Sequence, residues 1–139
     1  MPRSPSEAPP VIVSLHVATG ALGGALARSR LAAVPLGLLL HGLGDRMPHQ
    51  DIASERFEKL SGLGAVLLLA ASRGPGDAAV AGALACSAPD VEHVVRLPRP
   101  GGRKLFPTHR FSGWHRAGGV PAWVQLVAAG MILGSLLRR

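Results

Sequence analysis

Residues 11–27 read VIVSLHVATGALGGALA, and this stretch decides the fold. No charged residue interrupts it, and alanine and glycine recur in it at short spacings. Continuous apolarity with small residues at such spacings is typical of a helix packed against other helices, and not of a strand. We therefore predict a helix here.

Four further apolar segments follow, at 31–44, 60–72, 77–88 and 119–137. Hydrophobic residues make up 47% of the chain and aromatic residues only 4%, so its apolar mass is small side chains that let helices approach closely. The sequence predicts an all-α protein, a small bundle of about five apolar helices in one domain, residues 11–139. Residues 1–10, which hold four prolines, are predicted to be a disordered lead-in without a targeting pattern.

The mean hydropathy of +0.29 predicts that this bundle is embedded in a membrane by transmembrane helices. Only segments 11–27 and 119–137 approach the ~20 residues that cross a bilayer. The three middle segments are shorter and could be tilted, re-entrant or simply buried. If all five cross, connections 45–59 and 89–118 share one side. Because that side is richer in lysine and arginine, we expect a protein of the cell inner membrane whose polar connections face the cytoplasm.

The formal net charge of +7 is concentrated in the segment 96–116. Such a basic segment attracts anionic lipid head groups, a phosphorylated substrate or nucleic acid, and it also fits a cytoplasmic loop. No nucleic-acid partner is expected, because the charge does not spread along a polar face. The single cysteine, Cys86, excludes an internal disulfide and a cysteine-based zinc motif, and we interpret it as a buried packing residue.

A first cluster of polar residues ends the segment 31–44. His41 and Asp45 are four apart, which places both on one face of a helix, and Pro48 should end that helix. His49 and Asp51 then follow and can turn back toward the same point. Imidazole and carboxylate are ligands for divalent transition metals, so the cluster predicts a metal site, with a polar helix cap as the alternative.

A second cluster surrounds the basic segment. Asp90, Glu92 and His93 directly follow the segment 77–88, and two more histidines, His109 and His115, precede the last helix. The alternative is a polar loop in which carboxylates balance nearby arginines. The predicted metal ligands from both clusters are His41, Asp45, His49, Asp90, His93, His109 and His115.

Three residues are predicted to act in catalysis. Glu92 or Asp51 would serve as general base, and Arg110 would hold a phosphate or stabilise developing negative charge. His16, alone within the first apolar segment, is either a hydrogen-bonded interior histidine or an extra metal ligand.

The stretch Pro89-Asp-Val-Glu-His93, followed by His109-Arg110 and His115, resembles the inner-membrane-associated, metal-dependent hydrolases. That family carries Pro-Asp-x-Asp-His and then His-Arg-Gly-x-x-His. Here Glu92 stands in place of the second aspartate, Phe111 in place of the glycine, and the last interval is one residue longer. The first cluster is similar to a motif of small bacterial membrane proteins, so the resemblance spans about residues 14–118 through roughly a dozen positions.

The residues and the resemblance together predict a membrane-associated hydrolase that depends on a divalent metal ion. Zinc is favoured, with manganese or iron as alternatives. The basic segment favours an anionic substrate, either a small phosphoester or a lipid, and membrane lipid is the expected partner. The alternative function is a non-catalytic basic membrane protein whose polar connections recruit a partner or anionic lipid.

Overall fold

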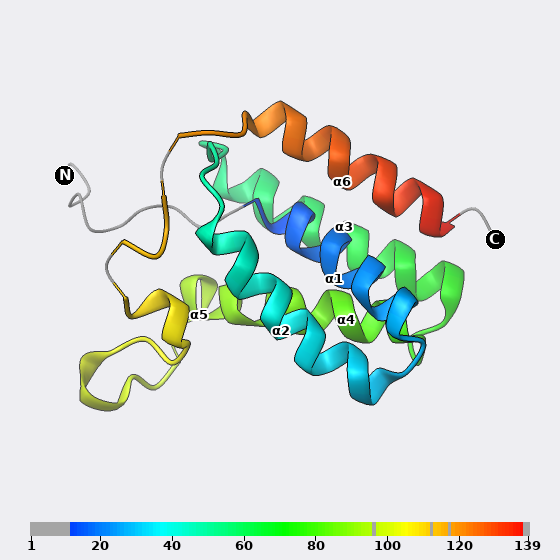
Figure 1. Cartoon of the computed structure of the whole chain (residues 1–139), viewed down its shortest axis with the longest axis horizontal. Helices are drawn as coiled ribbons and strands as arrows, with labels where there is room; N and C mark the ends of the chain where they lie inside the picture. Colours follow the sequence, from blue (N-terminus) through cyan, green and yellow to red (C-terminus); the bar gives the residue numbers. More distant parts are fainter. Residues whose placement is uncertain (1–11, 96, 112, 117, 138–139) are drawn as a thin grey trace.

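The structure of the chain is a computed structural model that describes residues 12–95, 97–111, 113–116 and 118–137. The lead-in predicted at 1–10 lies outside these residues. The described parts are helical, with one isolated bridge between His49 and Val120 in place of any strand, so the all-α prediction is confirmed. The long helices are α1 (Val13–Ala27), α2 (Arg30–Arg46), α3 (Glu55–Arg73), α4 (Ala78–Ser87) and α6 (Ala122–Leu137) (Figure 1).

Short helical turns carry the chain between α4 and α6. They are η1 (Ala88–Asp90), α5 (Val91–Val94), η2 (Pro100–Gly102) and η3 (Pro107–His109). Each of the η turns has a proline in its first two positions, where a missing N–H costs nothing because no carbonyl would receive it. This part of the chain is therefore a sequence of tight turns and not a further long helix.

Helix α1 is the centre of the bundle and packs against α2, α3, α4 and α6. This central place explains why the segment is apolar on every side. Its Val17 and Ala21 are fully buried and join the core cluster with Leu69 of α3 and Val80 of α4.

Helices α1 and α4 approach each other backbone to backbone along a stripe of small residues. A Cβ added to Gly20 would lie 2.4 Å from the carbonyl oxygen of Gly82, and one added to Gly24 would lie 2.0 Å from that of Ala78. The pairs run in opposite directions with a spacing of four residues, so α1 and α4 are antiparallel there. No side chain larger than hydrogen fits at these two glycines without separating the helices.

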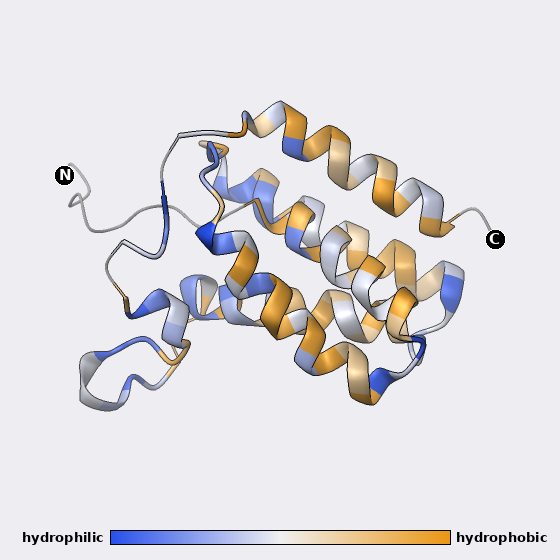
Figure 2. Cartoon of the chain, viewed as in Figure 1, coloured by the Kyte–Doolittle hydropathy of each residue, from blue (hydrophilic) through white to orange (hydrophobic). Residues whose placement is uncertain are grey.

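The two polar connections lie at the same end of the bundle. The α2–α3 connection and α5 lie together at the left of Figure 1, and the α1–α2 and α3–α4 turns lie at the opposite end. Figure 2 shows hydrophilic residues gathered at the first end while the helices are largely hydrophobic. The expected meeting of connections 45–59 and 89–118 is thus present in the structure, and it follows from the up-and-down order of the helices.

The prediction of transmembrane helices is wrong. Among the described residues, no helix combines the length and the apolarity that crossing a membrane requires. Helix α1 has 15 residues and α6 has 16, which at about 1.5 Å per residue falls short of the ~30 Å hydrocarbon core. Helix α3 has 19 residues, but its first turn carries Glu55 and Glu58. The structure therefore gives no support to a membrane-embedded bundle.

The high hydropathy of the chain arises because apolar residues also cover outer faces of these short helices. Leu31 and Leu39 of α2 are exposed, as are Leu63 and Leu68 of α3. The sequence pattern could not separate a helix that is apolar on two faces from a helix that is long enough to span a bilayer.

Candidate metal centre

Helix α2 buries one stripe of residues, which ends in two ligand-type side chains. The stripe consists of Ala33, Gly37, His41 and Asp45, each four positions after the last. This spacing stacks the side chains on one helical face. Nε2 of His41 lies 3.0 Å from Oδ2 of Asp45, and both side chains are buried. Helix α2 ends at Arg46 because Met47 precedes Pro48 and is extended.

His16 of α1 reaches the same carboxylate from the neighbouring helix. Its Nε2 lies 3.3 Å from Oδ1 of Asp45, and its ring lies 4.4 Å from that of His41, centre to centre. Gly44 makes room for this ring, since a Cβ there would lie 2.9 Å from Cε1 of His16. The close contact between α1 and α4 also sets the position of His16, whose Nδ1 lies 3.8 Å from the Cys86 sulfur.

The connection that precedes α6 folds back over α2 and brings two more histidines. Trp114 donates its indole N–H to the carbonyl oxygen of Gly42 at 3.0 Å, and the Arg46 guanidinium lies 5.0 Å from the centre of its ring. These contacts attach the connection to the end of α2. Nε2 of His109 then lies 3.6 Å from Oδ2 of Asp45, and Nε2 of His115 lies 3.7 Å from the same oxygen.

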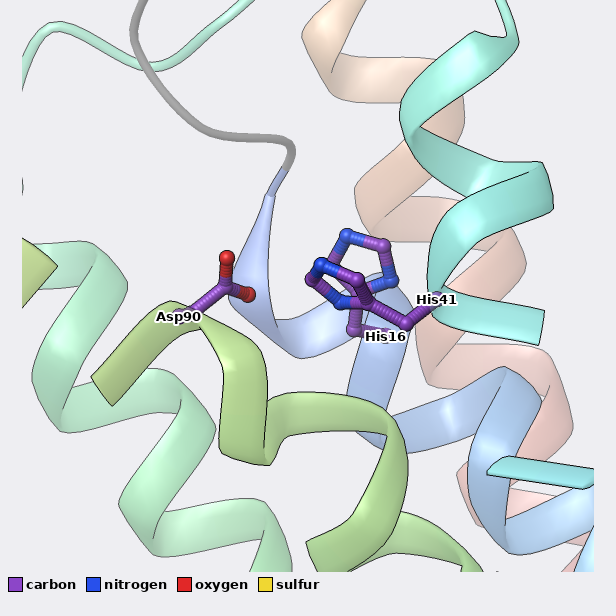
Figure 3. A group of neighbouring side chains, drawn as sticks. All are labelled: His16, His41 and Asp90. Atoms are coloured by element: carbon purple, nitrogen blue, oxygen red, sulfur yellow. The ribbon is translucent and has the colours of Figure 1, made fainter. Parts of the chain in front are cut away.

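Asp90 joins the cluster from the turn that ends α4. It is 4% exposed, and its carboxylate points toward the imidazoles of His16 and His41 (Figure 3). One donor atom from each of these three residues lies within 4.8 Å of the other two, and the same holds for Asp90, His93 and His109. The donors therefore form three overlapping groups, which come from α1, α2, η1, α5 and η3.

Hydrogen bonds at Nδ1 orient two of these histidines. Nδ1 of His41 lies 2.8 Å from the carbonyl oxygen of Cys86, which can only accept, so this nitrogen carries the proton. Nδ1 of His109 donates to the carboxylate of Glu92, which also accepts the N–H of Leu105 at 2.7 Å. A histidine held in this way presents the lone pair of Nε2, as metal-bound histidines do.

The two Nε2 atoms of His41 and His109 meet 3.4 Å apart beside Asp45. Two lone pairs at this distance repel each other unless a proton or a cation lies between them. Ligands of a tetrahedral zinc ion at 2.0–2.1 Å are separated by about 3.4 Å. The three distances among His41, His109 and Asp45 are 3.0, 3.4 and 3.6 Å, so these atoms already have nearly the spacing of a coordination triangle.

Several buried ligand atoms have no hydrogen-bond partner. They include both oxygens of Asp45, both oxygens of Asp90 and Nε2 of His16. The histidine nitrogens approach Asp45 closely but without hydrogen-bond geometry, as expected of groups that face a common ion. Burying carboxylates without hydrogen bonds is unfavourable, and a cation bound between them would reduce that cost.

The pKa values of the central groups reflect this crowding. Burial alone would raise the pKa of Asp45, but the adjacent His109, His16 and His41 hold it well below its usual range. Burial alone would lower the pKa of His41, but Asp45 and the charge of Asp90 raise it above its ordinary value. Burial raises the pKa of Asp90 against the opposing effect of His16 and His41. The negative charge of Asp45 is thus offset by the neighbouring histidines, whereas Asp90 is shifted toward its neutral form.

The outer histidines are shifted toward their neutral forms. Burial and the charges of His109 and Lys104 lower the pKa of His93 to about 4. Burial also lowers the pKa of His115, although Asp45 opposes that shift. A neutral imidazole is the form that binds a metal ion, so at neutral pH neither residue needs to lose a proton first.

Other predicted site residues lie apart from this cluster or have other partners. His49 pairs with Asp51, with Nε2 3.3 Å from Oδ1, and within the described part of the chain neither residue belongs to a group of donors that could hold an ion. Arg110 is exposed and donates to the backbone carbonyl of Lys104. Glu92 is 2% exposed and accepts hydrogen bonds from His109 and Leu105, so it orients a histidine of the cluster.

Glu58 of α3 is a buried carboxylate that the sequence analysis did not identify. It accepts the N–H of Val13 at 2.8 Å and so caps the start of α1, and burial raises its pKa. The contact joins residues 45 positions apart and depends on Gly62, where a Cβ would lie 2.5 Å from Val13 Cγ1. No local sequence pattern predicts such a contact between residues far apart in the chain.

A cavity of about 200 Å³ adjoins the cluster on the side of His16. Its wall is largely apolar and also includes three buried polar residues, His16, His49 and Gln125. The Oε1 atom of Gln125 has no hydrogen-bond partner. The lining residues are Leu15, His16, Thr19, Leu40, Leu43, Gly44, Met47, His49 and Gln125.

Comparisons with known proteins leave the site to be interpreted on its own geometry. No protein-family model, curated protein or solved structure matches the chain. What is established is therefore the class of protein: a small all-α bundle with buried groups of histidine and aspartate whose geometry can hold a metal ion.

Proposed function

We propose that the chain binds a divalent transition metal ion at His41, Asp45 and His109. The observation that carries this proposal is the meeting of two Nε2 atoms, 3.4 Å apart, beside a buried carboxylate whose oxygens have no hydrogen-bond partner. A stable pattern of histidine–aspartate ion pairs would instead give each carboxylate oxygen a hydrogen-bonded partner. Zinc suits a set of imidazole and carboxylate ligands best, and manganese or iron would accept the same set.

We further propose that the ion serves the hydrolysis of an anionic phosphoester. A divalent ion at this place would supply Lewis-acid chemistry and lower the pKa of a bound water toward neutrality. Lys104 supports the choice of an anionic substrate, because its Nζ lies 3.4 Å from Nδ1 of His93 at the rim of the cluster. His115 is 17% exposed, so the cluster is not sealed on the side of the basic connection.

One observation favours a second function, in which the ion has no catalytic role. Each of the three residues predicted to act in catalysis has another partner: Glu92 holds His109, Asp51 pairs with His49, and Arg110 binds a backbone carbonyl. In that case the ion would hold the basic connection in place, and the connection would recruit an anionic partner.

The first experiment is elemental analysis of the untagged full chain. We expect at least one equivalent of zinc, manganese or iron in the wild type and its loss in His41→Ala and His109→Ala. His49→Ala is the matched control, because it removes a buried histidine that pairs with Asp51 outside the ligand groups. A wild-type chain that is folded by circular dichroism and holds no metal after incubation with each ion would overturn the proposal.

A second measurement separates the two functions. Hydrolysis of bis(4-nitrophenyl) phosphate and of 4-nitrophenyl phosphate is followed with and without EDTA, for the wild type and His109→Ala. Activity that EDTA abolishes and added metal restores supports the hydrolase. A metal-loaded chain that hydrolyses neither ester favours the structural role.

A further inference from the structure

The donor set around Asp45 is larger than one ion requires. His41, His109 and one oxygen of Asp45 already form a coordination triangle, and a tetrahedral ion adds one more ligand. Among the donors left over, His16 and Asp90 are both almost fully buried, and both have polar atoms without a hydrogen-bond partner. Burying these groups without a partner is costly, so their presence needs a separate explanation.

The two oxygens of Asp45 face different groups of ligands. Oδ2 lies near Nε2 of His41 and of His109, at 3.0 and 3.6 Å. Oδ1 lies instead near His16, 3.3 Å from its Nε2. A carboxylate in this arrangement can bind one ion through each oxygen, whereas a histidine whose Nδ1 is already hydrogen-bonded can bind only one ion.

His16 and Asp90 belong to a further group of donors, whose third member is His41 of the first site. The free nitrogen of His16 is Nε2, since its Nδ1 lies against the Cys86 sulfur. Donor atoms of His16 and Asp90 lie within 4.8 Å of each other, and Figure 3 shows the Asp90 carboxylate directed at the histidine pair. These two residues come from α1 and from the turn after α4, and because the two helices are antiparallel, both residues lie at the same end of the stripe of small residues.

We propose that the site is dinuclear: a second divalent ion binds His16, Oδ1 of Asp45 and Asp90, and Asp45 bridges the two ions. This inference rests on the proposed function, because it adds an ion to the one at His41, Asp45 and His109. A carboxylate bridge places two ions about 3.5–4 Å apart, the spacing found in two-metal phosphatases and nucleases. A second ion suits the proposed phosphoester substrate, because a pair of ions stabilises both the attacking and the leaving oxygen of an in-line displacement.

The experiment counts ions and measures the coupling between them. The untagged full chain is stripped with EDTA, titrated with Mn²⁺ and studied by electron paramagnetic resonance, with the bound manganese counted after desalting. We expect two equivalents in the wild type and an exchange-coupled signal from neighbouring ions. His16→Ala and the isosteric Asp90→Asn should each retain one equivalent with an uncoupled six-line signal. His49→Ala should retain two coupled ions.

Each result has a definite meaning, and circular dichroism confirms folding of every variant. One equivalent in the wild type overturns the dinuclear site and leaves the proposed function intact. Two uncoupled equivalents also overturn it, because the second ion would then lie elsewhere. No bound manganese, iron or zinc overturns both proposals. The wild-type measurement alone decides the question if His16→Ala fails to fold.

Discussion

At the scale of single residues, the site depends on groups that touch no ion themselves. Glu92 holds His109 through Nδ1 and is fixed in turn by the N–H of Leu105. Burial alone would raise the pKa of Glu92, but its hydrogen bonds with His109 and Leu105 lower it. Glu92 is therefore an anion that increases the basicity of His109. We therefore expect the negative charge of Glu92 to matter more for the basicity of His109 than for a role as general base.

The substitution Glu92→Gln should lower the affinity for metal about 10–100-fold, since outer partners of metal-bound histidines contribute that much. The amide keeps the shape and loses the charge, so the free energy of unfolding of the metal-free chain should change little. Competition with a chromophoric chelator measures the affinity. Glu55→Gln is the control, because Glu55 forms an exposed ion pair with Lys59. Equal affinity in wild type and Glu92→Gln would show that Glu92 does not act through His109.

Cys86 provides a test of burial by pH. Burial raises the pKa of this thiol to about 12, against an ordinary value of 9.0. A thiol whose pKa is higher in the folded state stabilises that state below pH 9, and this contribution is lost as the pH rises from 9 toward 12. The free energy of unfolding of the wild type, relative to Cys86→Ala, should thus be constant from pH 6 to 8 and then fall by at most about 1.4 kcal/mol per pH unit. Urea titrations with both proteins measure the difference. A constant difference up to pH 11 would contradict burial of the thiol.

At the scale of helices, the stripe of small residues between α1 and α4 sets the position of the site. A Cβ at Gly82 would lie 2.2 Å from the carbonyl oxygen of Gly20, so Gly82→Ala must push the two backbones apart. We expect a loss of about 1–3 kcal/mol in the free energy of unfolding, the usual cost of overpacking. Because His16 lies on α1, the helix that Gly82→Ala pushes away from α4, metal affinity should fall as well.

Gly130→Ala in α6 is the matched control for this substitution. A Cβ at Gly130 meets nothing within 4 Å, so alanine there should stabilise the helix by about 0.5–1 kcal/mol. Thermal unfolding of the three proteins decides the matter. If Gly82→Ala were as stable as the wild type, α1 and α4 would not be in backbone contact.

The helices themselves could be predicted because each one is marked by its own local pattern. The segment 77–88 contains α4, and 119–137 contains α6. The third helix begins earlier than expected, at Glu55, because its first turn is charged and resembles a connection. Ser54 caps this turn by accepting the N–H of Phe57, a signal that the apolar pattern alone does not contain.

The candidate site could be predicted only where spacing along the chain implies spacing in space. His41 and Asp45 meet because they are four residues apart on one helix. The approach of His16 to Asp45 depends instead on Gly44 and on the contact of α1 with α4, which no local pattern reports. His49 follows Pro48, after the chain has left α2, and its side chain pairs with Asp51. Because spacing after a turn has no fixed geometry, the position of His49 could not be predicted in the same way.

At the scale of the whole molecule, the ions would join parts of the chain that otherwise have few contacts. The connection before α6 is tied to α2 by Trp114, and its histidines reach Asp45. Arg99 and Arg103 lie earlier in the same connection, before His109, and are exposed to solvent. Metal binding should therefore stabilise the fold and close the connection onto the bundle at the same time, since a ligand of the folded state alone adds about 2.7 kcal/mol at a concentration 100-fold above its Kd.

Limited digestion with trypsin tests this coupling. With excess Zn²⁺, cleavage within 97–111 should be slow, and removal of metal by EDTA should speed it at least several-fold, because no ion then joins His109 and His115 to Asp45. Trp114→Phe, which loses the bond to Gly42 but keeps an aromatic ring, should be cleaved faster than wild type in EDTA and should be largely protected again by Zn²⁺. Cleavage at Arg73, whose side chain bonds Asp77 and the carbonyl of Leu136 at the opposite end of the bundle, should not respond to metal and is the internal control. Equal rates of cleavage within 97–111 with and without Zn²⁺ would mean that no ion joins the connection to α2.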